Sequence, residues 1–238
     1  MGKIWFFGDS FCTNNDNWVA QVAKNLDCEI ASLGVAGTSI DFLAETLIAN
    51  RNLILEEDYV IVCITGYTRH YFRGENFRIS TAIDPHDDYV TFDSSTGLFV
   101  PIDQNKILAY EMFIKHLYTD EIHKKNSFII SNHIINEIIP SLPTKKVVYF
   151  FSMADEIKTF EFFKQNQSVI CKPLYRVFKE FVESTEDYKK LTEEDQQVLK
   201  AKLLLTNNHF IEDPEYYKMF WKEINPVLEL IGAQIKID

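Results

Sequence analysis

Closely spaced cysteines are absent from this 238-residue sequence. Its four cysteines, Cys12, Cys28, Cys63 and Cys171, are scattered along the chain and form no C-x-x-C pair. Zinc knuckles and small disulfide frameworks both depend on cysteines at short, regular intervals. We therefore expect free thiols in a reducing compartment and no structural metal.

The sequence also lacks a long apolar run and an excess of positive charge. No segment approaches the length of about 20 apolar residues that a membrane span requires, and the first apolar run is too short for a signal-peptide core. Lys and Arg number 24 against 35 Asp and Glu, a formal net charge of -11, whereas nucleic acids and anionic membranes select clustered Lys and Arg. We expect a cytoplasmic protein that binds neither nucleic acid nor a membrane.

Phosphate-binding and cation-binding patterns are missing as well. No P-loop or G-x-G-x-x-G arrangement occurs, which argues against a nucleotide-binding domain with glycine-rich phosphate loops. The acidic turns "DPHDD" at 84–88 and "IEDPE" at 211–215 match no defined calcium loop. We therefore expect neither a metal ion nor an organic cofactor.

Short apolar strands alternate with amphipathic helices along much of the sequence. The strand at 59–65, "YVIVCIT", is β-branched and apolar on both faces, so we expect it to be central in a parallel sheet. Further strands are predicted at 4–7, 28–34, 145–153 and 168–171. Helices are predicted at 18–26, 40–49, 107–118, 127–139 (ending at Pro140), 174–182 and 215–231, with a solvated, charged helical face reaching 197.

This order of elements predicts an α/β protein with a flavodoxin-like, three-layer α/β/α architecture and a central parallel sheet of about five strands. The length and the 46% hydrophobic content suit a single domain spanning 1–238. The alternation of strands and helices is interrupted at about 71–140. There we expect an inserted loop and helical region, with a small hairpin on "YVTF" and "GLFVPI". The aromatic residues of this insertion suit either a lid or sugar platform, or a satellite core.

Ligands of such sheets bind outside the carboxyl ends of the strands. The loops that follow the predicted strands begin at 8–10, 34–37, 66–68 and 154–155. In the first, "KIWFFGDSFC", Ser10 follows a buried strand, where a side chain is exposed at the sheet edge and backbone N–H groups can stabilise negative charge. Alternatively, Asp9 and Ser10 only satisfy N–H groups of the loop or of a helix.

Three segments, in this order, resemble the SGNH or GDSL hydrolase family of esterases, lipases and carbohydrate deacetylases: "FFGDSFC", "SLGVAGTSID" and "TNNHFIEDPEYY". The resemblance implies Ser10 as nucleophile, the backbone N–H of Gly37 as an oxyanion-hole donor, and His209 as general base. A glycine at position 37 would allow close approach of the backbone to substrate, although it would equally serve a turn. The run "ITGYTRHYF" resembles, more loosely, a divergent variant found in phage- and bacterium-encoded members.

The sequence departs from the family pattern at two places. The family's Gly-x-Asn-Asp is Gly-Tyr-Thr-Arg here, so Thr68 stands where an amide donates to the oxyanion, and losing such a donor costs roughly a hundred- to a thousand-fold in rate. Arg69 would replace it electrostatically or bind an anionic group. The family's D-x-x-H aspartate is Thr206 here, which leaves His209 without its usual orienter.

We therefore expect an ester hydrolase that acts on a small-molecule or carbohydrate ester, such as an O-acetyl group, through a Ser-His site. His70, beside two aromatic residues, suits packing better than catalysis. The alternative is a catalytically reduced member that binds an acylated sugar or a partner protein; the sequence leaves the oligomeric state open. The predicted site comprises Ser10 and His209 for catalysis, Ser10, Gly37 and Thr68 as oxyanion hole, and Asp9, Arg69, Thr206 and Asn208 as support.

Overall fold

The chain forms a mixed α/β structure around an all-parallel sheet of four strands in the order β2-β1-β3-β8. The computed structural model describes residues 2–9, 12–13, 18–35, 38–65, 69–72, 75–78, 90–93, 98–101, 105, 108–109, 112, 120–152, 174–197 and 214–232. The strands of the parallel sheet are β1 (Lys3–Phe7), β2 (Glu29–Ser32), β3 (Tyr59–Ile64) and β8 (Val147–Phe151). These strands confirm four of the five predicted ones, and the fifth, at 168–171, lies outside the described residues.

Strand β3 is central, as its sequence predicts. It pairs with β1 from Tyr59 to Val62 and with β8 from Val60 to Ile64, and all six of its residues are buried. Because this strand is covered on both faces and paired on both edges, a charged side chain on it would be buried in the core. This explains why an uninterrupted uncharged, largely β-branched run forms it.

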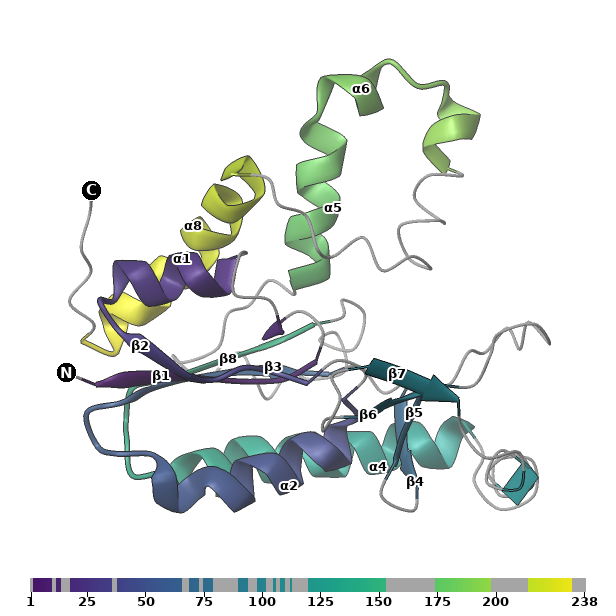
Figure 1. Cartoon of the computed structure of the whole chain (residues 1–238). Coiled ribbons are helices and arrows are strands. Elements are labelled where there is room, and N and C mark those ends of the chain that lie inside the picture. The colour runs from purple at the N-terminus through teal and green to yellow at the C-terminus, as the bar shows by residue number, and fades with distance from the viewer. Residues whose placement is uncertain are drawn as a thin grey trace.

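Helices cover both faces of this sheet (Figure 1). Helices α1 (Trp18–Asn25) and α8 (Pro214–Leu230) pack on one face, while α2 (Ile40–Asn50) and α4 (Asp120–His133) lie on the other. Helix α5 (Leu174–Ser184) packs against α8. Because successive strand residues point to opposite faces, alternate residues of β1 and β3 belong to two separate apolar cores.

An aromatic cluster centred on Trp18 holds the first face together. The Trp18 ring lies 5.7 Å from Phe6 of β1, 5.8 Å from Phe150 of β8 and 4.6 Å from Phe220 of α8, measured between ring centroids. Most of these pairs are edge-to-face, the arrangement that aromatic quadrupoles favour. The cluster therefore joins α1 and α8 to two strands of the sheet.

The second face is closed by a helix that changes its geometry. Helix α4 continues as a π-helical turn, η3 (Ile134–Ile138), and then as a 3-10 turn, η4 (Ile139–Ser141). The predicted helix at 127–139 is thus confirmed, but it begins earlier, at Asp120, and Pro140 lies in the first turn of η4, where a proline N–H is not needed. The wider π turn brings Ile134, Ile135 and Ile138 into the core.

Two antiparallel hairpins interrupt the alternation of strands and helices. The pair β6 (Val90–Asp93) and β7 (Leu98–Pro101) confirms the hairpin predicted on "YVTF" and "GLFVPI". A second pair, β4 (Arg69–Phe72) with β5 (Glu75–Arg78), was not predicted. Of the helix predicted at 107–118, only residues 108–109 and 112 are described, and they are helical.

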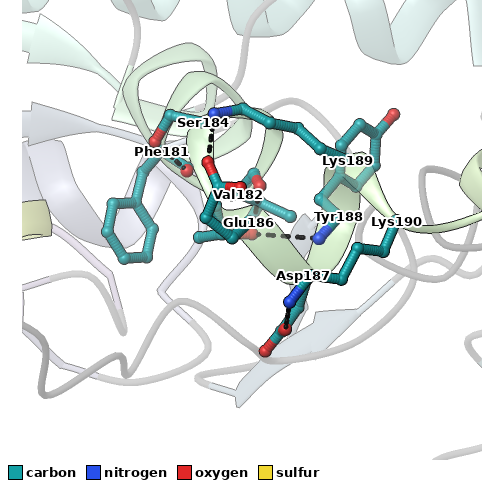
Figure 2. A network of polar contacts seen from close by, with 9 residues as sticks. Phe181, Val182, Ser184, Glu186, Asp187, Tyr188, Lys189 and Lys190 are labelled. Carbon is teal, nitrogen blue, oxygen red and sulfur yellow. Dashed lines mark hydrogen bonds and ion pairs between the residues drawn. The ribbon is translucent and has the colours of Figure 1, made fainter.

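The turn after α5 shows how the charged segment is organised (Figure 2). The Ser184 hydroxyl donates to the Phe181 carbonyl at 2.6 Å, and the Thr185 hydroxyl donates to the Val182 carbonyl at 2.8 Å. Thr185 also accepts from the Tyr188 N–H at 3.3 Å and so caps α6 (Glu186–Lys189). Two neighbouring hydroxyls therefore end one helix and start the next.

Solvent-exposed ion pairs occupy the outer side of α6, as predicted for this stretch. Lys189 pairs with Glu186 at 2.7 Å and Lys190 with Asp187 at 3.4 Å (Figure 2). The hydrogen bond and charge of Lys189 lower the pKa of the Glu186 carboxyl. Exposed pairs of this kind contribute little to stability, so the stretch needs no ligand to explain its charge.

Asp58 anchors the amino-terminal edge of the sheet. Its carboxylate accepts from the Lys3 N–H at 2.7 Å, the Trp5 indole N–H at 2.9 Å and the Leu55 N–H at 3.0 Å. Its backbone carbonyl accepts from the Thr144 hydroxyl at 2.6 Å. One buried residue, 1% exposed, thus connects β1 to the starts of β3 and β8.

The hydrogen bonds of Asp58 also set its protonation. Burial alone would raise the pKa of the carboxyl, but the hydrogen bonds from Lys3, Leu55 and Trp5, with the charge of Lys3, outweigh it and hold the pKa below its ordinary value. A carboxyl whose folded-state pKa is depressed contributes stability above its unfolded pKa of about 3.9, and loses it as the pH falls through the folded-state value.

We expect Asp58→Asn to lower the free energy of unfolding by about 2 kcal/mol at pH 7, because an amide accepts at only one of its two terminal atoms. The difference from wild type should shrink as the pH falls below about 4. Urea unfolding at pH 7 and pH 3 measures both effects, with the exposed Asp187→Asn as a control expected within about 0.5 kcal/mol of wild type. An equal loss at both pH values would contradict this account of Asp58.

Candidate active site at the carboxyl edge of the sheet

The turn that follows β1 is held close to β3. The Cys12 N–H donates to the Asp9 carbonyl at 2.9 Å, a bond that brackets Ser10 and Phe11, which lie outside the described residues. Gly8 has a φ of +152°, and a Cβ at this position would lie 2.7 Å from Cys63 Cβ and 2.8 Å from the Cys63 carbonyl oxygen. Only glycine permits this backbone conformation and this approach to β3.

The loop after β2 is locked against the loop after β1. The Val35 N–H donates to the Gly8 carbonyl at 2.9 Å, and the Gly34 N–H donates to the Cys12 carbonyl at 2.9 Å. A Cβ on Gly34 would lie 2.8 Å from the carbonyl oxygens of both Gly8 and Asp9. The described segments that precede Ser10 and Gly37 are therefore hydrogen-bonded to each other.

Hydroxyl groups then fix the start of α2. The Thr38 hydroxyl donates to the Val35 carbonyl, and the Thr38 N–H donates to the same oxygen at 3.2 Å. Ser39 caps α2 by accepting from the Phe42 N–H at 3.3 Å. Both hydroxyl residues are buried. The described residues on either side of 36–37 are thus bonded to each other, and a cap follows at the start of α2.

Two acidic residues lie in these segments. Asp9 is buried, 2% exposed, and comes directly before Ser10. Asp41 is in the first turn of α2, where burial raises the pKa of its carboxyl, Glu45 adds to the rise and a hydrogen bond to its own backbone opposes it. The sequence interpretation did not single out Asp41; the available signal is an acid two residues after a capping serine.

Two buried hydroxyl residues lie where β3 and β8 end. Thr65 follows β3 directly and Ser152 follows β8, and the Ser152 N–H donates to the Ile64 carbonyl at 2.9 Å. Within the described chain neither side-chain oxygen has a hydrogen-bond partner. The sequence interpretation missed both residues, and its only available signal was a hydroxyl residue placed immediately after an apolar strand.

The structure places some of the predicted site residues and leaves others undescribed. Arg69 begins β4, where it stands opposite Arg78 of β5, and β4 lies against α2. His70 stands opposite Phe77 in the same hairpin. Asp9 lies two residues after the end of β1. The remaining predicted residues lie outside the described residues, namely Ser10, Gly37, Thr68, Thr206, Asn208 and His209.

The described ranges contain neither a metal-binding cluster nor a membrane-spanning helix. There, no three His, Cys, Asp or Glu side chains gather in a way that would hold a metal ion. None of the helices in those ranges combines the length and apolar character needed to cross a membrane.

Comparisons with protein-family models, with curated proteins and with solved structures found no match.

Proposed function

We propose that this protein is a serine hydrolase of the SGNH or GDSL type that cleaves an ester of a small molecule or carbohydrate. The observation that carries the proposal is the locking of the first two loops, through Val35 to Gly8 and Gly34 to Cys12, both at 2.9 Å. In the proposed mechanism a nucleophile from the first loop and an N–H donor from the second must act on one carbonyl group. Two loops that share a rigid frame meet that requirement.

The order of the strands supports a flavodoxin-like, three-layer architecture in this proposal. The parallel strands, counted along the chain, follow the order 2-1-3-4, and the flavodoxin-like order is 2-1-3-4-5. A fifth strand at 168–171 would then pair with β8 on the side away from β3, where the described sheet ends. All five residues of β8 are buried although it is the last strand of the described sheet, which suits such a neighbour.

The proposed reaction begins with attack of the Ser10 hydroxyl oxygen on the ester carbonyl carbon, while His209 accepts the hydroxyl proton. The N–H groups of Ser10 and Gly37, with the Thr68 hydroxyl, donate to the oxygen on which negative charge develops. The carbon–oxygen bond to the alcohol then breaks, and the alcohol leaves with the proton from His209. A water molecule, deprotonated by His209, releases the acyl group and restores Ser10.

The two departures from the family pattern favour the second candidate, a binding protein for an acylated sugar or a partner protein. Thr68 and Thr206 replace an amide donor and a carboxylate that orients the base. The retained pair of Ser10 and His209 favours the enzyme, because binding alone requires neither a nucleophile nor a base. In the proposed enzyme, Asn208 or a backbone carbonyl would orient His209, while Asp9 and Arg69 would support the loops.

Labelling with a fluorophosphonate probe tests the proposal directly. We expect the native wild-type protein to be labelled, with the adduct located on Ser10 by peptide mass spectrometry, and to hydrolyse p-nitrophenyl acetate. Protein unfolded in urea is the control and should not react, because activation of a serine depends on the folded site. A native protein that neither reacts with the probe nor cleaves nitrophenyl or sugar acetates would leave the binding protein as the better hypothesis.

A further inference from the structure

Thr65 and Ser152 occupy neighbouring positions directly after two adjacent parallel strands. The register pairs Ile64 of β3 with Phe151 of β8, and each hydroxyl residue comes immediately after one of these two residues. The bond from the Ser152 N–H to the Ile64 carbonyl continues the ladder to this point. Adjacent strands lie about 4.8 Å apart, so one small ligand atom between the two side chains can contact both.

The alternation of the strands assigns both residues to the same face of the sheet. Ile61 and Cys63 of β3 belong to the core beneath α1 and α8, as do Val148 and Phe150 of β8. Thr65 and Ser152 come two residues after Cys63 and Phe150, so where the strands end they continue these two rows. They form the polar end of an otherwise apolar face, at the carboxyl edge of the sheet.

Both hydroxyls are buried, and neither has a partner among the described residues. Thr65 and Ser152 are each 0% exposed, and neither side-chain oxygen makes a hydrogen bond in the part of the chain that the structure describes. An unpaired buried hydroxyl is unfavourable, and native proteins nearly always supply a partner, often an ordered water or a ligand. Two such groups in register indicate one common partner.

Thr144, at the opposite edge of the same sheet, shows what a purely structural buried threonine does. Its hydroxyl donates to the Asp58 carbonyl at 2.6 Å and accepts from the Lys146 N–H at 3.0 Å. Its oxygen is therefore satisfied by the protein alone. Thr65 is equally buried, but its hydroxyl has no hydrogen-bond partner among the described residues.

We propose that Thr65 and Ser152 form a binding site for one neutral oxygen ligand, held by hydrogen bonds to both hydroxyls. A hydroxyl donates one hydrogen bond and accepts others, so a pair of them matches a neutral oxygen that carries lone pairs. The buried polar residues of the described chain include no Lys, Arg or His, so nothing there would compensate an anion. The oxygen belongs either to a resident water molecule or to the bound ester, and the second case rests on the proposed function.

Thermal unfolding of Thr65→Val and Ser152→Ala tests for the resident water, with Thr144→Val as the matched control. The control should lower Tm by about 2 °C or more, because it removes a satisfied buried hydroxyl. If a water molecule occupies the site, Thr65→Val and Ser152→Ala lower Tm in the same way, since each removes one of its partners. If the site is empty without substrate, both variants keep or raise Tm, because each removes an unsatisfied group.

Kinetics with p-nitrophenyl acetate test for the ester oxygen. In that case Thr65→Val and Ser152→Ala raise KM about 3- to 10-fold with kcat within about twofold, and Thr65→Ser, which keeps the hydroxyl, restores the wild-type KM. Variants that match or exceed the wild-type Tm and keep its KM would overturn the proposed site. A wild type without esterase activity would refute the proposed function separately, and the Tm comparison alone would then decide on the site.

Discussion

Ser10→Ala is expected to lower kcat/KM for the proposed ester hydrolysis by about a thousand-fold or more, while the protein stays folded. Alanine removes the only atom of residue 10 that can form the acyl intermediate, and what remains is the contribution of the oxyanion hole and of substrate binding. Initial rates with p-nitrophenyl acetate, alongside far-UV circular dichroism and Tm, measure the two expectations separately.

His209→Ala should cause a loss of similar size, and the double variant should lose little more, because a nucleophile and its base act as one unit. Ser184→Ala is a suitable control, since it removes a serine hydroxyl that donates to the Phe181 carbonyl in the last turn of α5. It should keep the wild-type rate. A Ser10→Ala variant as active as wild type would exclude Ser10 as the nucleophile.

Gly8→Ala is expected to give the largest loss of stability, about 3 to 4 kcal/mol, which corresponds to a fall in Tm of roughly 10 °C. Gly8 has a φ of +152°, and a Cβ there would lie 2.7 Å from Cys63 Cβ and 2.8 Å from the Cys63 carbonyl oxygen. Because β3 is fixed by pairing on both edges, the loop that leads to Ser10 must move instead. We therefore expect esterase activity to fall together with Tm.

Gly232→Ala separates the effect of backbone strain from the effect of the steric clash with Cys63. Gly232 also has a positive φ, +79°, but a Cβ there would have nothing within 4 Å. This control therefore introduces backbone strain without a steric clash, and it should lower the free energy of unfolding by about 1 kcal/mol. Denaturant unfolding of both variants gives the comparison. Equal losses at the two positions would mean that the close approach of β1 to β3 contributes nothing.

The sequence was sufficient to predict those strands and helices whose type follows from the local spacing of apolar residues. The uncharged run Tyr59–Thr65 predicted a strand buried on both faces, and the structure places its residues Tyr59–Ile64 between two parallel neighbours. The amphipathic spacing at 215–231 likewise predicted a helix, and α8 lies there with Phe220, Ile224 and Leu228 buried in the core. The spacing of apolar residues indicates the type of element because each strand or helix must bury one or both of its sides.

Other features could not be predicted because they depend on distant partners. The π-helical turn at Ile134–Ile138 has the same apolar spacing as an ordinary helix, and its geometry accompanies the packing of three isoleucines on the sheet. The hairpin of β4 and β5 joins two short, mixed segments whose own patterns are too weak to predict a strand. For these elements tertiary packing overrides local preference.

For the candidate site, the sequence by itself determined the residue types and their order: a serine after the first strand, glycines after the second and a histidine before the last helix. Only the tertiary structure decided that Gly8 must pass against Cys63, that the first two loops share hydrogen bonds, and that Thr65 and Ser152 are neighbours. The physical reason is that the pleat and the helical turn are properties of a short segment. Contacts between parallel strands depend instead on their register, and that is set by the packing of the whole sheet.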